Sequence, residues 1–128
     1  MDHSAFIKEW LSAWTGAGDA QAVEKLLHFY HDEFFYADPA IRDGISSKEE
    51  LADYFGRLLQ RNPHWVWEAE ELIPTPGGCT LKWKATIPVN GELLTEYGLD
   101  ILEIRDGRIS RNEVFFDRLN WLSKLQRE

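Results

Sequence analysis

Two aspartates occupy positions at which a carboxyl group could transfer protons. Asp100 lies in the segment 96–104, in which alternate residues form an apolar row. Because successive side chains of a strand point to opposite faces, this alternation places Asp100 within that row. A charge in a core-facing row is costly unless it is paired, hydrogen-bonded or protonated. Asp38 directly precedes Pro39 and is the second candidate.

The two carboxyl groups are most informative as a pair. Two carboxyls across one pocket can hold opposite protonation states and so supply a base and an acid at the same pH. Asp38 would then be a general base that removes a proton next to a carbonyl, and Asp100 would be the acid or oxyanion donor. Each also has a structural alternative. Asp38 could cap backbone N–H groups of the loop after an Asp-Pro turn. Asp100 could pair with a basic residue, for which the candidates are Lys82, Arg105, Arg108 and Arg111.

Histidines and tryptophans suggest two further kinds of site. His28 and His31, with Asp32 and Glu33 beside them, have the spacing at which two helical residues could share a metal. A third ligand is needed, and histidines near a helix C-terminus also suit the helix dipole, so we expect no metal. The tryptophans could stack on a flat ligand or belong to the core, and they are Trp65, Trp67 and Trp83.

Composition limits the class of protein. The 128 residues predict one domain, residues 1–128, and the 44% apolar content excludes disorder. The net charge of −8 without a basic stripe argues against nucleic-acid binding. The single Cys79 excludes an internal disulfide and suits a reducing compartment. No apolar run of signal-peptide or membrane-span length is present, so we expect a soluble cytoplasmic protein that does not bind membranes.

The elements that position these residues can be read from periodicity. A capping box, Ser47-Lys48-Glu49-Glu50, begins the clearest helix. Asp106-Gly107 and Asn90-Gly91 are tight hairpin turns. The expected order begins with a helix capped by Ser4 and ended by Gly16 and Gly18, a helix capped by Asp19 with Tyr30 in its buried stripe, a short strand 33–36 and a loop 40–46. A helix ended by Asn62-Pro63 follows, then strands 65–73 and 79–89, and after Asn90-Gly91 a strand that continues into the hairpin 96–117. This order predicts an α+β fold with helices against a curved antiparallel sheet.

This order resembles the nuclear-transport-factor-2-like superfamily, which includes the ketosteroid isomerases and the SnoaL-like polyketide cyclases. Two motifs carry the likeness, the Tyr36-Ala37-Asp38-Pro39 junction and the strand–Asp106-Gly107-Arg108-Ile109–strand ending. The resemblance implies a cone-shaped α+β fold, with three N-terminal helices packed on the sheet. It also implies that Asp38 is the general base and Asp100 the protonated acid, and that the sheet face forms a homodimer.

The remaining site positions follow from the same resemblance. Trp14 falls where the isomerases have an oxyanion-hole tyrosine and Phe55 where they have a supporting tyrosine, and the other implied pocket positions are Tyr30, Leu81, Trp83, Asn112, Val114 and Phe116. An indole N–H can donate a hydrogen bond but is larger and differently placed than a phenol. Because Trp14 and Trp83 would also fill space that a steroid needs, we expect no true steroid isomerase.

We therefore expect an apolar cavity for a small apolar or aromatic carbonyl or hydroxyl compound, with isomerase or cyclase chemistry that needs no cofactor. Two alternatives stay open. One is a binder that holds an apolar ligand without catalysis. The other is a dimerisation or partner-binding domain whose cavity is filled by its own side chains. In that case the strand face shared by Trp65 and Trp67 would be the working surface, provided that it points away from the helices.

Overall fold

The computed structural model describes residues 3–14, 21–61, 64–117 and 119, and these contain three helices and six strands. The helices are α1 (Ser4–Trp14), α2 (Ala22–Leu27) and α3 (Lys48–Arg61). The strands are β1 (Tyr30–Asp38), β2 (Ile41–Ile45), β3 (Val66–Thr75), β4 (Gly78–Val89), β5 (Glu92–Arg105) and β6 (Arg108–Phe115). No helix in the described ranges is long and apolar enough to cross a membrane.

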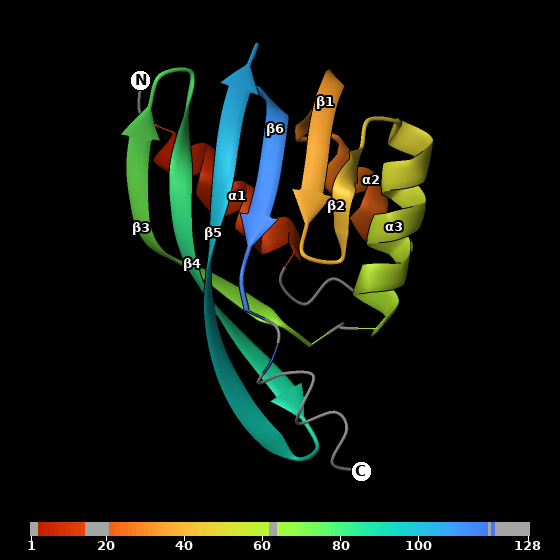
Figure 1. Cartoon of the computed structure of the whole chain (residues 1–128), viewed down its shortest axis with the longest axis vertical. Coiled ribbons are helices and arrows are strands. Elements are labelled where there is room, and N and C mark those ends of the chain that lie inside the picture. The colour runs from red at the N-terminus through yellow and green to blue at the C-terminus, as the bar shows by residue number, and fades with distance from the viewer. Residues whose placement is uncertain (1–2, 15–20, 62–63, 118, 120–128) are drawn as a thin grey trace.

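The strands form one curved sheet in the order β2-β1-β6-β5-β4-β3 (Figure 1). The four pairings along consecutive strands are antiparallel, as expected. The pairing of β1 with β6 is parallel, and β2, α3 and the strands β3 to β5 lie between these two strands in the chain. The predicted α+β cone is confirmed, and the sheet is mixed rather than purely antiparallel.

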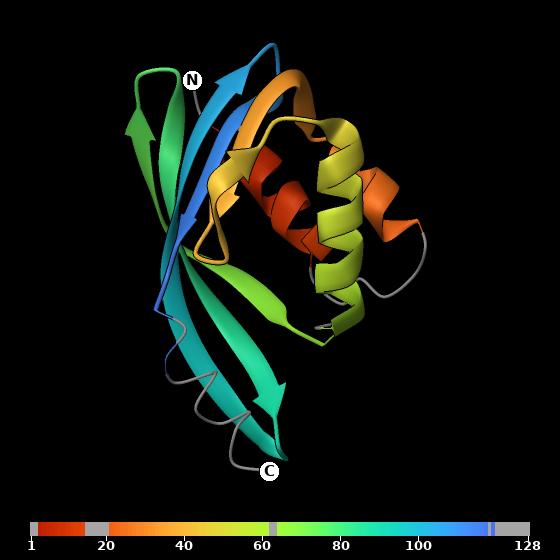
Figure 2. The same cartoon turned by 45° about the vertical axis from the view of Figure 1, so that its right-hand side comes forward.

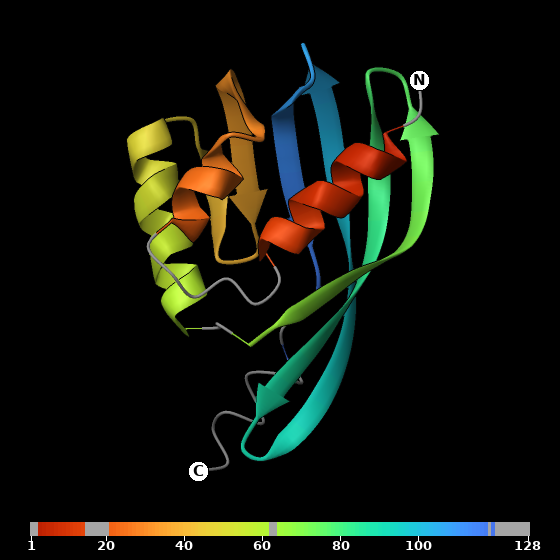
Figure 3. The same ribbon diagram turned by 180° about the vertical axis from the view of Figure 1, so that it is seen from behind.

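The three helices lie on one face of the sheet, and the sheet curves toward them (Figure 2). Seen from behind, α1 crosses the strands and α3 stands near the β1–β2 edge (Figure 3). The apolar stripe of α1 buries Ile7, Trp10 and Leu11, and that of α3 buries Leu51, Phe55 and Leu59. Burial of these stripes against the sheet makes the core, since each helix is amphipathic.

Both predicted hairpin turns are present. Asn90 and Gly91 have φ values of 50° and 79°, and Asp106 and Gly107 have 53° and 76°. Two successive positive φ angles match the right-handed twist of the flanking strands. The first turn joins β4 to β5 and the second joins β5 to β6, so together they bring Asp100 to the centre of a three-strand unit.

Three predictions about local structure differ from what the structure shows. The segment 41–45 is the strand β2 rather than a loop, because it pairs with β1 and places Ile45 opposite Tyr36. The helix expected to reach Tyr30 ends at Leu27, and Tyr30 begins β1, which therefore starts before residue 33. Pairing between strands overrides local propensity at both places. The expected signals Gly16, Gly18, Asp19 and Asn62-Pro63 lie outside the described residues.

The third helix begins as predicted. The backbone N–H of Leu51 donates to the carbonyl oxygen of Ser47 at 2.9 Å, and the N–H of Glu50 lies 3.5 Å from the Ser47 hydroxyl. A serine that accepts from the first turn satisfies N–H groups that have no partner within the helix. These contacts define the start of α3.

Candidate functional site

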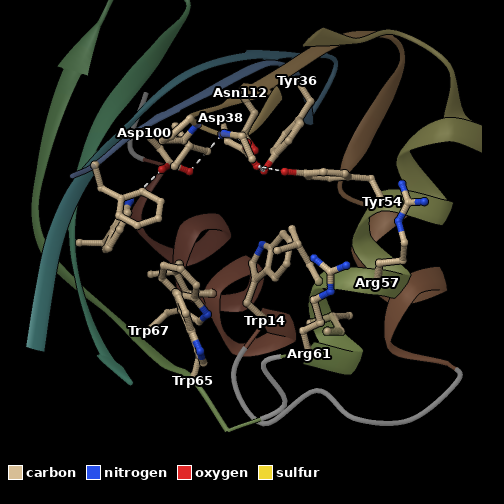
Figure 4. Close-up of a pocket in the computed structure, with 18 of the residues that line it drawn as sticks. Trp14, Tyr36, Asp38, Tyr54, Arg57, Arg61, Trp65, Trp67, Asp100 and Asn112 are labelled. Carbon is tan, nitrogen blue, oxygen red and sulfur yellow. Dashed lines mark hydrogen bonds between the residues drawn. The ribbon is translucent and has the colours of Figure 1, made fainter. Parts of the chain in front are cut away.

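A cavity of about 650 Å³ opens between the sheet and the helices α1 and α3. Five of the six tryptophans line it, namely Trp10, Trp14, Trp65, Trp67 and Trp83. Its polar and charged lining comes from Tyr36, Asp38, Tyr54, Arg57, Arg61, His64, Asp100 and Asn112 (Figure 4). A volume of this order holds a small organic ligand, and an aromatic wall with few polar groups is typical of such sites.

Asp100 is held in the wall of this cavity by two neutral donors. The Trp83 indole N–H donates to Asp100 Oδ1 at 2.7 Å, and the Asn112 side-chain N–H donates to Oδ2 at 3.0 Å. The Asn112 amide is itself oriented, because the Tyr30 hydroxyl donates to its Oδ1 at 2.7 Å. Each carboxyl oxygen therefore has a fixed partner, so the orientation of the group is defined before any ligand arrives.

The sheet register explains why these groups meet. On the helix-facing side, Asp100 stands between Leu81 of β4 and Val114 of β6. Trp83 is opposite Gly98, and a Cβ atom at position 98 would overlap the Trp83 indole ring. The missing side chain lets the indole lie across β5, and a diagonal neighbour on the next strand is within reach of a long side chain. Gly98 thus creates the space through which Trp83 reaches Asp100.

Burial raises the pKa of the Asp100 carboxyl from 3.8 to about 7. The hydrogen bonds from Asn112 and Trp83 lower it, and the charge of Asp38 raises it. None of the predicted basic partners pairs with Asp100 in the described part of the chain: Arg105 binds Glu33, and Arg111 binds Glu103 and Glu113. Without a cation, desolvation of the charged form dominates. Such a group exchanges protons near neutral pH.

Asp38 is held quite differently, at the end of β1. The hydroxyls of Tyr36 and Tyr54 both donate to its Oδ2 at 2.7 Å. The backbone N–H groups of Ala40 and Ile41 donate to its Oδ1 at 2.8 and 3.1 Å. The backbone contacts are those of the turn-capping alternative. Its predicted role as a base stays a prediction, and that base would have to displace a donor, because a carboxylate offers about four lone-pair sites.

The tyrosines around Asp38 are donors at ordinary pH. Burial raises the pKa of Tyr36 well above its usual value, and the neighbouring Asp38 charge adds to this effect. Tyr36 is 4% exposed and lines the cavity beside Tyr54. A phenol that stays protonated can donate either to Asp38 or to an oxygen atom of a ligand. This tyrosine pair is the main polar feature that the sequence analysis did not identify.

The structure brings together most of the predicted site residues. Asp38, Asp100, Trp14, Trp83, Asn112, Val114 and Phe116 all line the cavity. Tyr30, Phe55 and Leu81 do not line it, and each is 0% exposed. Tyr30 acts through Asn112, and Phe55 packs edge-on against Trp14 with ring centroids 4.7 Å apart. These three residues support the wall rather than face a ligand.

Further lining residues come from one stripe of α3, which has Tyr54, Arg57, Leu58 and Arg61 at helical spacing. Tyr54 and Leu58 also belong to the apolar periodicity of this helix, whereas the sequence analysis did not single out Arg57 and Arg61. Trp65 and Trp67 also line the cavity, and Trp67 packs against Trp83 at 4.9 Å. Their strand face therefore points toward the helices, so the condition under which these tryptophans would form an outward working surface is not met.

The histidines do not have the predicted helical arrangement. His28 caps α2 and His31 lies in β1, so the two are not on one helix. His31 contacts Asp106 at 3.4 Å and the Arg105 guanidinium at 3.2 Å. Across the described ranges, no three His, Cys, Asp or Glu side chains are grouped so that they could hold a metal ion.

Comparison with known structures places this fold in a class. A protein assigned as a SnoaL-like polyketide cyclase, from Jannaschia sp. CCS1, shares 12% identity over 98% of this chain and 92% of its own, with a TM-score of 0.81. A protein with a ketosteroid isomerase-like fold from Catenulispora acidiphila DSM 44928, crystallised with trimethylamine, shares 15% identity over 94% and 91%, with a TM-score of 0.78. TerC, co-crystallised with polyporic acid, shares 15% identity over 94% and 97%, with a TM-score of 0.74.

These likenesses show that the chain has the α+β cone fold of these proteins. At such identities they establish the fold alone. The family model described as the SnoaL-like domain matches residues 7–112. The chain therefore belongs to the SnoaL-like family. A search among curated proteins found no match to the sequence.

Proposed function

We propose that this protein catalyses proton transfer next to the carbonyl group of a flat, largely apolar compound, without a cofactor. The observation that carries this proposal is Asp100. It is 5% exposed, stands in an aromatic cavity, has a pKa raised to about 7, and is oriented by Trp83 and Asn112. Membership of the SnoaL-like family, and a neighbour crystallised with polyporic acid, support a small-molecule ligand.

In the proposed step, the ionised Asp100 removes a proton from the carbon next to the carbonyl. The C–H bond breaks, its electron pair moves toward the carbonyl oxygen, and the proton forms an O–H bond on Asp100. Return of that proton to another carbon completes an isomerisation. In a cyclisation, the enolate carbon instead attacks a second carbonyl of the same molecule, a C–C bond forms, and the oxygen of that carbonyl takes the proton back from Asp100. Hydroxyl donors beside the cavity, those of Tyr36 and Tyr54, would stabilise the enolate oxygen.

The test is deuterium exchange, because it needs only a C–H bond next to a carbonyl and not the natural substrate. 2-Tetralone, a two-ring ketone, is incubated with the protein in D₂O and its exchange is followed by NMR. We expect faster exchange than in buffer, with a rate that rises through a midpoint near the Asp100 pKa of about 7. Asp100→Asn should abolish the enhancement. Asp43→Asn, at an exposed strand position outside the cavity, is the control.

A non-catalytic binder is the second candidate, and the contacts of Asp38 favour it. All four of its hydrogen bonds come from the protein, so the carboxylate is a wall group already satisfied. Naphthols and flat hydroxylated polycyclic compounds should raise the melting temperature under either proposal. A binder would give this stabilisation without any exchange of 2-tetralone, and binding would survive Asp100→Asn.

We also propose that the outer sheet face binds a second copy of this chain. Leu99 of β5 and Phe115 of β6 are directly opposite and are 42% and 38% exposed, and Tyr97 on the same face is 54% exposed. Clustered apolar side chains of this kind mark interaction surfaces. Light scattering should give the mass of a dimer, and Leu99→Lys should give that of a monomer. A monomeric wild type would contradict the proposal.

A cytoplasmic location likewise stays a prediction from the sequence, to be checked by cell fractionation.

A further inference from the structure

The charges of the cavity lining are divided between two groups. The acidic side chains, Asp38 and Asp100, are buried and belong to the sheet. The basic ones, Arg57, Arg61 and His64, are exposed and belong to α3 and the segment that follows it. A ligand in this cavity would therefore meet neutral or acidic groups at one end and cationic groups at the other.

The two arginines occupy equivalent places on α3. They are four residues apart, a spacing that puts side chains on the same helix face one turn from each other. Tyr54 and Leu58 precede them by three residues each in the same stripe, and all four side chains line the cavity. In Figure 4 both arginine side chains extend from α3 on the opposite side of the cavity from Asp100.

Neither arginine has an acidic partner among the described residues, although the chain carries a net charge of −8. Asp53 lies one helical turn before Arg57, a spacing suited to an ion pair, yet the described residues form no such pair. By contrast, Arg105 and Arg111 each contact a glutamate at 3.3 Å. Guanidinium groups recognise carboxylates and sulfates through paired hydrogen bonds, so two free ones at a cavity mouth form a receptor for an anion.

We propose that the ligand is an anionic aromatic compound, whose ring system fills the tryptophan-lined cavity and whose carboxylate or sulfate binds Arg57 and Arg61. The inference rests on the proposed function and narrows its substrate class. The anion must lie at the α3 end, because the buried carboxyls of Asp38 and Asp100 would repel it at the sheet end. This polarity also orients the ligand, with its carbonyl or hydroxyl group directed toward Asp100.

The test compares two naphthalene probes by calorimetric titration, 2-naphthol and 6-hydroxy-2-naphthoate, which differ in the carboxylate at the end opposite the hydroxyl. We expect the carboxylate to bind about fivefold more tightly, as two exposed guanidinium contacts would give. Added salt should reduce this preference. In Arg57→Gln/Arg61→Gln the preference should disappear, while the affinity for 2-naphthol stays within about twofold. Arg108→Gln, an exposed arginine outside the cavity, should keep the preference.

The outcomes separate this inference from the proposed function. Equal binding of both probes, or a preference that survives the double substitution, overturns the anionic ligand and leaves an aromatic cavity in place. Binding of neither probe overturns both. Arg61 could instead only stabilise α3 by complementing the dipole at its end. In that case the double variant has a lower melting temperature, and the ratio of its affinities for the two probes does not change.

Discussion

The two aspartates in the cavity are both buried, yet the protein surrounds them differently. Asp38 ends a strand, where a turn and two tyrosines provide four donors. Asp100 stands in mid-strand between Leu81 and Val114, with one indole and one amide as its donors. The two buried carboxyls therefore differ in the number and kind of their donors. The two donors of Asp100 only partly offset desolvation, which raises its pKa to about 7.

The largest expected effect separates the two carboxyls by rate. In the exchange of 2-tetralone, Asp100→Asn should lose about 100-fold or more of the enhancement, the usual contribution of a general acid–base group. Asp38→Asn should lose less than about tenfold, because its amide oxygen still accepts from the turn. If instead Asp38→Asn abolishes exchange and Asp100→Asn retains it, Asp38 is the base that the family resemblance implies, and Asp100 only supports it.

The pH dependence of stability should reveal the same difference without any substrate. A carboxyl whose folded pKa is raised binds its proton more tightly in the folded state. Its contribution is fully present below the unfolded pKa near 4 and is lost as pH rises through the folded pKa of about 7. Asp100→Asn has no such titration. Between pH 4 and pH 8 its free energy of unfolding should therefore rise relative to that of the wild type by roughly 3–4 kcal/mol. Urea unfolding at several pH values measures this, and a pH-independent difference would contradict the raised pKa.

Removal of the Asp38 carboxyl should cost stability at every pH, because it leaves several donors without partners. Asp38→Ala removes the acceptor of the Tyr36 hydroxyl and of the N–H groups of Ala40 and Ile41. Buried donors left unsatisfied cost about 1–3 kcal/mol each, so we expect a loss of about 3 kcal/mol. Asp38→Asn should cost about 1 kcal/mol, since it keeps one oxygen as an acceptor. Equal stability of Asp38→Ala and wild type would mean that the turn does not depend on this carboxyl.

Much of the fold was accessible from the sequence because its signals are local. Positive φ angles at Asp106-Gly107 and the start of a helix at Ser47 depend on neighbouring residues alone, and both predictions are confirmed. The strand β2 and the parallel pairing of β1 with β6 were not accessible, because they depend on partners distant in sequence. Alternation placed Asp100 on the buried face, but it could not reveal that Trp83 and Asn112 would be its donors.

The candidate site shows the same limit. The family resemblance predicted that Asn112, Val114 and Phe116 line the cavity, and they do, whereas Tyr30 and Leu81, predicted in the same way, lie behind its wall. Whether a helix residue lines the cavity depends on the rotation of the helix about its axis, and periodicity predicts that rotation only approximately. Phe55 accordingly faces the core, while Arg57 and Arg61 face the cavity.

The smallest expected effect concerns one donor of Asp100. Trp83→Phe keeps an aromatic ring but removes the N–H that donates to Oδ1, and that hydrogen bond lowers the pKa of Asp100. The pH midpoint of exchange should therefore move upward. Gly98→Ala should move the midpoint in the same direction, because a Cβ atom at position 98 would overlap the Trp83 indole and displace it. The two substitutions together should shift the midpoint little more than either alone, since both remove one hydrogen bond. Trp67→Phe, which packs against Trp83 without contacting Asp100, should leave the midpoint unchanged. A midpoint unmoved in Trp83→Phe would show that the indole positions Asp100 without tuning its proton affinity.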